Sequence, residues 1–165
     1  MSPPPASDRG RAGLTALFGA TFLELCGLFM YGPLLLFTLK ERGLSTSTIG
    51  LFSAAQWLGM ALATPFTALW VRRLGARGAL LLSAAVPFVA FTLMNLTEQI
   101  AVWTVLYLFA GMAGSLRWIV AESMVAELAP AARRGRIVGL FETMVGLTFV
   151  VGPALLAALT SAGID

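Results

Sequence analysis

The sequence has no histidine, one cysteine and few charged residues, and each shortage excludes a class of function. Without histidine or a pair of cysteines, the usual ligands of a zinc or iron centre are missing. Cys26 has no second cysteine with which to form an internal disulfide, so cysteine pairing says nothing about the redox compartment. The sequence also lacks a Gly-x-Ser-x-Gly motif and a phosphate-binding loop. We therefore expect no enzyme activity, no metal and no cofactor.

The scarcity of charge also excludes a soluble globular domain. Charged residues make up 12% of the 165 residues and hydrophobic residues 58%, whereas about a quarter of the residues of a soluble protein are charged. The chain is therefore expected to be an integral membrane protein whose first partner is the lipid bilayer. The net charge of +3 does not indicate nucleic acid, because the arginines lie in short gaps between apolar runs.

Five apolar runs are long enough to cross a bilayer, which takes about 20 helical residues. An all-α bundle of five transmembrane helices is predicted in residues 13–165, after a disordered cytoplasmic tail at residues 1–12 that contains three consecutive prolines. The predicted spans are residues 13–39, 49–71, 79–96, 100–125 and 137–159. Helix kinks are expected at Pro33, at Pro65 and at the Gly152-Pro153 pair.

The basic residues predict the orientation of these spans. If the N-terminus is cytoplasmic, eight arginines fall on the cytoplasmic side and only two basic residues, Lys40 and Arg42, fall on the opposite side. The eight are Arg9, Arg11, Arg72, Arg73, Arg77, Arg133, Arg134 and Arg136. We expect a plasma membrane or bacterial inner membrane, with the last residues of this chain outside.

Four charged residues fall inside the predicted spans, where each costs at least about 2.5 kcal/mol to insert. Measured from the cytoplasmic ends of their spans, Glu24 is about 16 Å deep, Arg117 about 12 Å, Glu142 about 8 Å and Glu122 about 5 Å. Arg117 and Glu122 point about 140° apart on one helix, so they are not expected to pair. One cation cannot neutralise three acids, so at least one carboxylate is expected to be desolvated.

Two explanations of these charges remain open: residues that line a transport path, or a structural ion pair that joins helices. In the first explanation, Glu24 is the expected proton or cation site, and Arg117 sets the electrostatic field around it. Gln56 and Tyr31 lie on polar stripes that suit either a cavity wall or hydrogen bonds between helices. The candidate site residues are Glu24, Arg117, Glu142, Glu122, Gln56 and Tyr31.

Two arginine-rich loops contain motif-like residues. The loop ALWVRRLGAR, residues 68–77, is similar to Gly-x-x-x-Asp-Arg-x-Gly-Arg-Arg: it keeps Arg73, Gly75 and Arg77, but has Arg72 in place of the aspartate. With this motif the chain resembles the major facilitator superfamily. Ala68 and Ala76 replace a glycine and an arginine of the motif. PAARRG, residues 130–135, resembles Pro-x-x-x-Arg-Gly and follows Glu127.

The resemblance implies a cytoplasmic gate formed by Arg72, Arg73, Gly75, Arg77, Glu127 and Arg134. Because Arg72 replaces the aspartate that helps to hold this gate in the family, we expect Glu127 to pair with Arg73 or Arg77 instead. The chain is then the N-terminal half of a proton-coupled secondary transporter that moves a small organic solute by alternating access. Family members have about twelve spans, so we expect a truncated or split product that needs a missing C-terminal half or a second copy. The alternative is a non-transporting assembly partner whose charges are structural.

Overall fold

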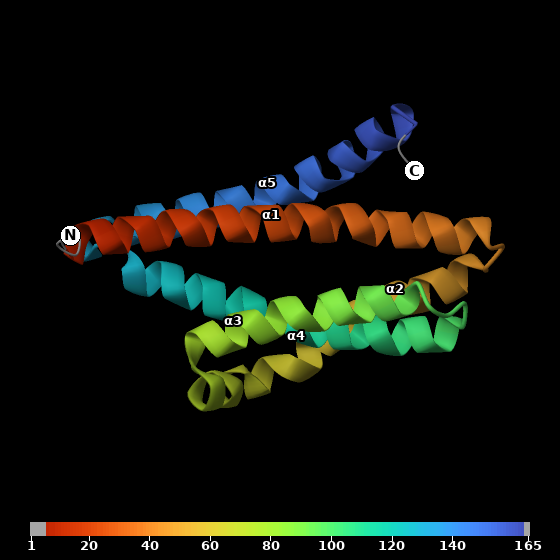
Figure 1. Cartoon of the computed structure of the whole chain (residues 1–165), viewed down its shortest axis with the longest axis horizontal. Coiled ribbons are helices and arrows are strands. Elements are labelled where there is room, and N and C mark those ends of the chain that lie inside the picture. Colours follow the sequence, from red (N-terminus) through yellow and green to blue (C-terminus); the bar gives the residue numbers. More distant parts are fainter. Residues whose placement is uncertain (1–5, 164–165) are drawn as a thin grey trace. The chain divides into compact units, whose positions relative to one another are not determined.

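The computed structural model describes residues 6–163, and these residues are helical apart from short connections (Figure 1). The predicted all-α class is confirmed for this part of the chain. The elements are α1 (Ala6–Glu41), α2 (Thr46–Ala63), the 3-10 turn η1 (Thr64–Phe66), α3 (Thr67–Met94), α4 (Ile100–Leu128), the 3-10 turn η2 (Ala131–Arg133) and α5 (Arg134–Ser161).

Within the described residues, four helical stretches are long and apolar enough to cross a membrane, one fewer than the five predicted spans. They are Gly10–Glu41, Thr46–Met94, Ile100–Leu128 and Ala131–Ser161. The difference arises because the predicted spans 49–71 and 79–96 belong to one stretch of 49 residues. Helical backbone continues through η1 and on both sides of Gly75, and the non-helical backbone of Gly75 separates two helical segments within α3.

The beginning of the chain also differs from its predicted tail. Because α1 begins at Ala6, residues 6–12 are helical, and residues 1–5 lie outside the described part. The three prolines occupy positions 3–5, and the next proline is Pro33. Alanine and arginine, which occur at Ala6, Arg9, Arg11 and Ala12, are good helix formers. Pro33 and Pro153 lie inside α1 and α5, and Pro65 lies in η1, where the helix tightens.

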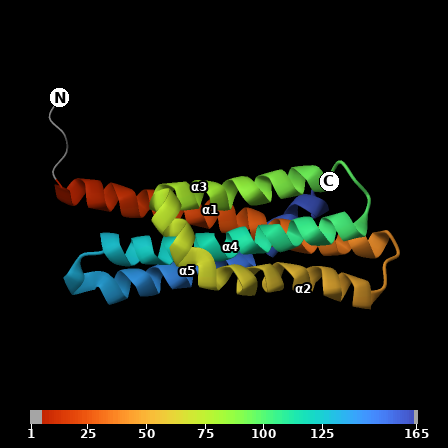
Figure 2. The same cartoon turned by 90° about the horizontal axis from the view of Figure 1, so that it is seen from below.

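The chain forms two compact units. The unit Leu39–Ala121, here called the α2–α4 unit, contains α2, α3 and most of α4. Helices α2 and α4 run parallel, since the Phe52 ring stacks on Tyr107 and the Thr64 hydroxyl reaches Ser115 (Figure 2). Helix α3 runs antiparallel to α4, because Phe91 contacts Tyr107 while residues nearer the start of α3 face Phe109. The chain therefore reverses direction between α2 and the second part of α3.

Gly75 is the residue at which this reversal takes place. Its backbone angles, φ 70° and ψ 165°, are the only non-helical angles recorded inside α3. A residue with a Cβ rarely adopts this positive φ, whereas glycine does so at little cost. The glycine of the arginine-rich loop thus has a structural role that its sequence position alone did not reveal.

The other unit, Met1–Thr38 with Glu122–Asp165, contains most of α1, the end of α4 and α5, and is here called the α1–α5 unit. Helices α1 and α5 pack side by side through two aromatic pairs, Phe18–Phe141 and Phe29–Phe149, with ring centroids 5.2 Å and 3.9 Å apart. A Cβ added to Gly152 would lie 2.8 Å from the Cβ of Phe29. Gly152 thus allows close contact of these helices just before Pro153.

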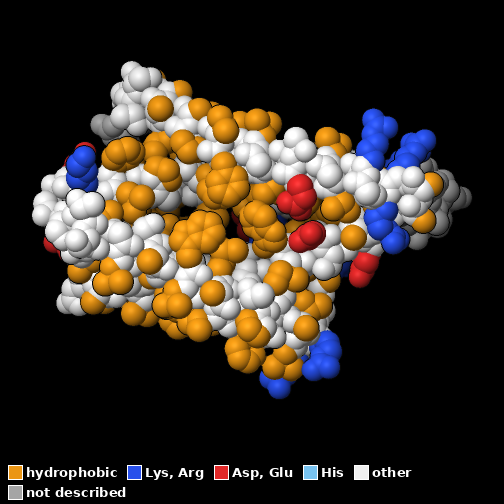
Figure 3. All heavy atoms as spheres, turned by 180° about the vertical axis from the view of Figure 1, so that it is seen from behind, with side chains coloured by type: hydrophobic (Ala, Val, Ile, Leu, Met, Phe, Trp, Pro, Cys, Tyr) orange, Lys and Arg blue, Asp and Glu red, His pale blue; other side chains and the backbone are white. Residues whose placement is uncertain are grey.

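Large hydrophobic side chains remain exposed on the helices of both units. Leu51, Trp57 and Phe88 are 71%, 60% and 73% exposed, and hydrophobic side chains cover much of the face in Figure 3. So much apolar surface is unfavourable in water and is expected for helices that face lipid.

Candidate functional site

The α1–α5 unit brings together two of the predicted acidic residues. Glu142 in α5 is partly buried, and within the described residues its Oε1 is a buried atom without a hydrogen-bond partner. Glu122 near the end of α4 is exposed, and its carboxylate interacts electrostatically with that of Glu142. A buried carboxylate oxygen without a partner is costly at membrane depth, so Glu142 remains a candidate acid of the site.

Both acids were predicted as site residues, but the electrostatic interaction between them was not. Their expected depths, about 5 Å and about 8 Å, already placed them in neighbouring layers of the membrane. Helices α4 and α5 are separated by only a short connection, so residues near this end of both helices are neighbours. The expected depths of Glu122 and Glu142 and the short connection between α4 and α5 together could have indicated that these two acids interact.

Glu24 and Tyr31, the other two candidates in this unit, lie on α1. Both side chains are partly buried, and they are seven residues, about two helical turns, apart. They therefore share one face of α1, as the predicted polar stripe requires. The structure leaves Glu24 as a candidate acid at membrane depth.

Arg117 and Gln56 belong to the α2–α4 unit. Arg117 is 9% exposed and lies in the part of α4 where most side chains are buried. Because Glu24 and Glu142 are in the other compact unit, pairing of Arg117 with either of them stays a prediction. The side chain of Gln56 is partly buried, and its backbone carbonyl is the part of the residue that faces Gly111 of α4.

Helices α2 and α4 approach each other closely through two glycines. A Cβ added to Gly111 would overlap the carbonyl oxygen of Gln56, and a Cβ added to Gly59 would overlap that of Leu108. Beyond this contact, the hydroxyls of Thr64 and Ser115 lie 2.9 Å apart and form a hydrogen bond between η1 and α4. The sequence alone does not single out Gly59 or Thr64, because neither is recognisable without knowledge of which helices meet.

The predicted gate residues are exposed. Arg72, Arg73 and Arg77 surround the reversal at Gly75, and their side chains are open to the surroundings. Arg134, the first residue of α5, and Glu127, next to the last residue of α4, are also exposed. Glu127 belongs to the other compact unit, so its pairing with Arg73 or Arg77 stays a prediction.

At the opposite end of the α2–α4 unit, Trp103 joins two connections that sequence analysis did not link. Its indole Nε1 donates a 2.8 Å hydrogen bond to the carbonyl oxygen of Thr97. The guanidinium of Arg42 lies 4.7 Å from the centroid of the same ring, within the range of a cation–π interaction. Trp103 therefore fixes the connection before α4 and contacts the connection before α2.

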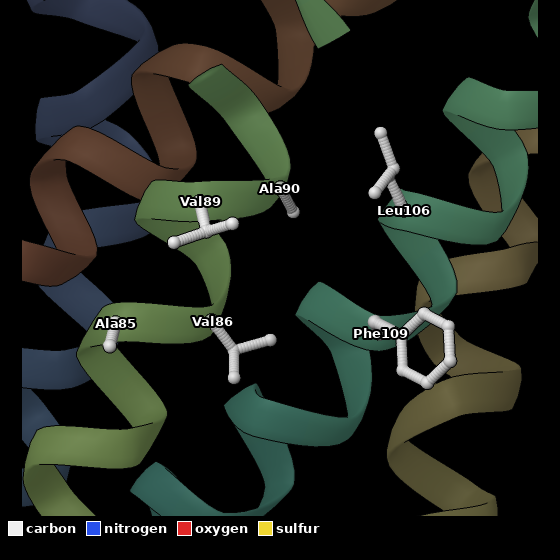
Figure 4. Close-up of a pocket in the computed structure, with 6 residues that line it drawn as sticks. All are labelled: Ala85, Val86, Val89, Ala90, Leu106 and Phe109. Carbon is white, nitrogen blue, oxygen red and sulfur yellow. The ribbon is translucent and has the colours of Figure 1, made fainter. Parts of the chain in front are cut away.

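A pocket of about 270 Å³ lies between α3 and α4. Figure 4 shows its lining side chains, which are Ala85, Val86, Val89 and Ala90 from α3 and Leu106 and Phe109 from α4. None of the six can donate or accept a hydrogen bond through its side chain. The pocket contains no predicted site residue and offers only apolar contacts.

Comparison with known proteins gives the family. A model of the Major Facilitator Superfamily matches residues 17–164. The uncharacterized MFS-type transporter YfkF of Bacillus subtilis is 23% identical over 73% of this chain and 31% of its own length. Multidrug resistance protein 2 of the same organism is 20% identical over 83% of this chain and 34% of its own length.

The chain thus spans about a third of the length of these two relatives. No solved structure matches the sequence significantly. The family match covers nearly all of the described residues, and it agrees with the long apolar helices. The chain is an integral membrane protein that belongs to the Major Facilitator Superfamily.

Proposed function

We propose that this chain is the N-terminal half of a proton-coupled secondary transporter that moves a small organic solute by alternating access. Family membership supports transport, and both relatives are named as transport or resistance proteins. The observation that supports proton coupling is the side chain of Glu142, whose buried Oε1 has no hydrogen-bond partner among the described residues. A partly buried acid at membrane depth is stable in its protonated form, and in its charged form it attracts a cation.

Five membrane crossings are part of the proposal. The stretch Thr46–Met94 has 49 residues, and at 1.5 Å per residue a straight helix of this length would measure about 73 Å. The hydrocarbon core is only about 30 Å thick, so the stretch fits if it crosses twice. The reversal at Gly75 provides the turn, and the positive-inside rule places its arginines in the cytoplasm. The N-terminus is then cytoplasmic, and the last helix ends outside.

Alternating access requires two bundles that rock around a central site. Because the chain spans about a third of its relatives, we propose that further spans or a second copy supply the other bundle. One relative is named a multidrug resistance protein, and acids at membrane depth would attract an organic cation. A lipophilic organic cation is therefore the solute class that we propose.

The test measures proton movement driven by a solute. The polypeptide, as expressed from its own gene, is reconstituted into liposomes that contain a pH-sensitive dye, and a gradient of ethidium is imposed. We expect ethidium to drive a change of internal pH that is abolished by Glu142→Gln or by Glu24→Gln. Each glutamine keeps the shape of the side chain and removes its titratable charge. The matched control is Glu98→Gln, which changes an exposed acid in the connection between α3 and α4.

Wild-type proton movement in both Glu142→Gln and Glu24→Gln would refute proton coupling through these acids. Solute movement without any change of internal pH would support transport but not coupling. If neither solute nor protons move while the protein remains folded, the non-transporting assembly partner becomes the better interpretation. Its intramembrane charges would then only hold helices together.

A further inference from the structure

We infer that the turn between α2 and the second part of α3 binds the headgroup of an anionic phospholipid. The site consists of Arg72, Arg73 and Arg77 around Gly75, together with the ring of Trp70. This inference is independent of the proposed transport function, because it concerns the lipid that surrounds the protein and not the solute.

The turn is strongly basic. All three arginine side chains are exposed, and the sequence has no aspartate or glutamate between Glu41 and Glu98. These two acids lie beyond the opposite ends of α2 and α3, at least about 25 Å of helix away from the turn. The α2–α4 unit therefore offers no acid near the turn. If Glu127 pairs with one arginine as predicted, two positive charges still remain.

The backbone of the turn places the arginines around a reversal of the chain. The positive φ of Gly75 ends one helical segment and begins the next, so Arg73 and Arg77 stand on either side of a reversal. Because the helix reverses at Gly75, these arginines do not lie along one face of a single helix. Each guanidinium can donate two parallel hydrogen bonds to phosphate oxygens, which suits a phosphodiester better than a single point charge would.

The apolar neighbours of the turn identify the source of the phosphate. Leu69, Trp70 and Leu74 are 36%, 47% and 45% exposed, so apolar side chains lie open beside the arginines. A free phosphate ion would gain nothing from this surface. A phospholipid would place its acyl chains against it and its phosphate against the guanidinium groups. Tryptophan is also the side chain that best suits the boundary between headgroups and hydrocarbon.

The experiment compares two triple variants that remove the same charge. Detergent-solubilised protein is incubated with equal amounts of phosphatidylglycerol and phosphatidylcholine, and the lipid that copurifies is quantified by mass spectrometry. One variant carries Arg72→Gln, Arg73→Gln and Arg77→Gln, and its matched control carries Arg133→Gln, Arg134→Gln and Arg136→Gln. All six arginines are exposed, so neither variant removes a buried contact. Thermal unfolding verifies that both variants fold.

We expect the wild type to retain at least about fivefold more phosphatidylglycerol than phosphatidylcholine, since each arginine near a headgroup favours an anionic lipid by about that factor. The first variant should lose this preference, and the control should keep most of it. Equal losses in the two variants would overturn the inference, because net charge alone would then explain binding. Full displacement of the lipid by inorganic phosphate at constant ionic strength would instead assign the site to free phosphate.

Discussion

Replacement of Gly111 by alanine tests a close backbone contact between α2 and α4. The added methyl group would overlap the carbonyl oxygen of Gln56, and the Cα of Gln56 would lie only 2.9 Å away. These are backbone atoms, so a rotamer change cannot relieve the overlap, and α2 must move away from α4. Excess volume at a tightly packed site costs about 1–3 kcal/mol. Gly111→Ala should therefore destabilise the protein by about this amount.

The control is Gly114→Ala on the same helix. A Cβ at Gly114 would meet no atom within 4 Å, so the substitution creates no overlap. Alanine favours helix over glycine by about 1 kcal/mol, and the control should therefore be neutral or slightly stabilising. The free energy of unfolding of each variant is measured by denaturant titration in detergent micelles, followed by tryptophan fluorescence.

A second substitution makes the test sharper. Gly59→Ala should have a similar cost, because its methyl group would overlap the carbonyl oxygen of Leu108 across the same contact. A single separation of α2 from α4 relieves both overlaps, so the double variant should cost clearly less than the sum of the single variants. If Gly111→Ala proves as stable as Gly114→Ala, or if the two costs add fully, the close approach of α2 and α4 is wrong.

The hydrogen bond between Thr64 and Ser115, the orientation of the spans and the role of Arg72 can each be tested. A double-mutant cycle of Thr64→Val and Ser115→Ala should give a coupling energy of about 0.6 kcal/mol, as is usual for hydrogen bonds between membrane helices. The absence of measurable coupling would contradict the hydrogen bond between these hydroxyls. In a protein whose Cys26 is replaced by serine, Leu74→Cys and Ala132→Cys should react with a thiol reagent only from the cytoplasmic side, and labelling of either from outside would refute the proposed orientation. Arg72→Asp restores an acid to the turn and should shift the balance between inward-open and outward-open states, measured by distances between spin labels in the assembled transporter; an unchanged balance would remove Arg72 from the gate.

The class of the fold was predictable from the sequence because apolar length and charge scarcity do not depend on which helices meet. Predicted and observed helices overlap throughout, and the end of the predicted span 100–125 lies close to the observed Leu128. The number of spans was less predictable. The gap between the predicted spans 49–71 and 79–96, residues 72–78, has seven residues and no proline, and only the backbone of Gly75 interrupts the helix. Because the backbone is helical on both sides of Gly75, the two predicted spans belong to one helical stretch.

The candidate site depends on residue types, which the sequence shows, and on contacts between helices, which it does not. Depth along a helix placed Glu122 and Glu142 in neighbouring layers, and the structure makes them electrostatic neighbours. The rotation of one helix relative to another depends on packing, which a single sequence does not reveal. For this reason Gly59 and Thr64 were not selected, although both lie where α2 meets α4.

The ring of Tyr107 has a consequence for motion. It stacks on Phe52 of α2 with an angle of 3° between the planes, and it also contacts Phe91 of α3 with centroids 6.4 Å apart. A rotation of α4 about its own axis would have to break both ring contacts in one step. Small independent adjustments of these three helices are therefore unfavourable, and a movement of α4 would tend to carry α2 and α3 with it.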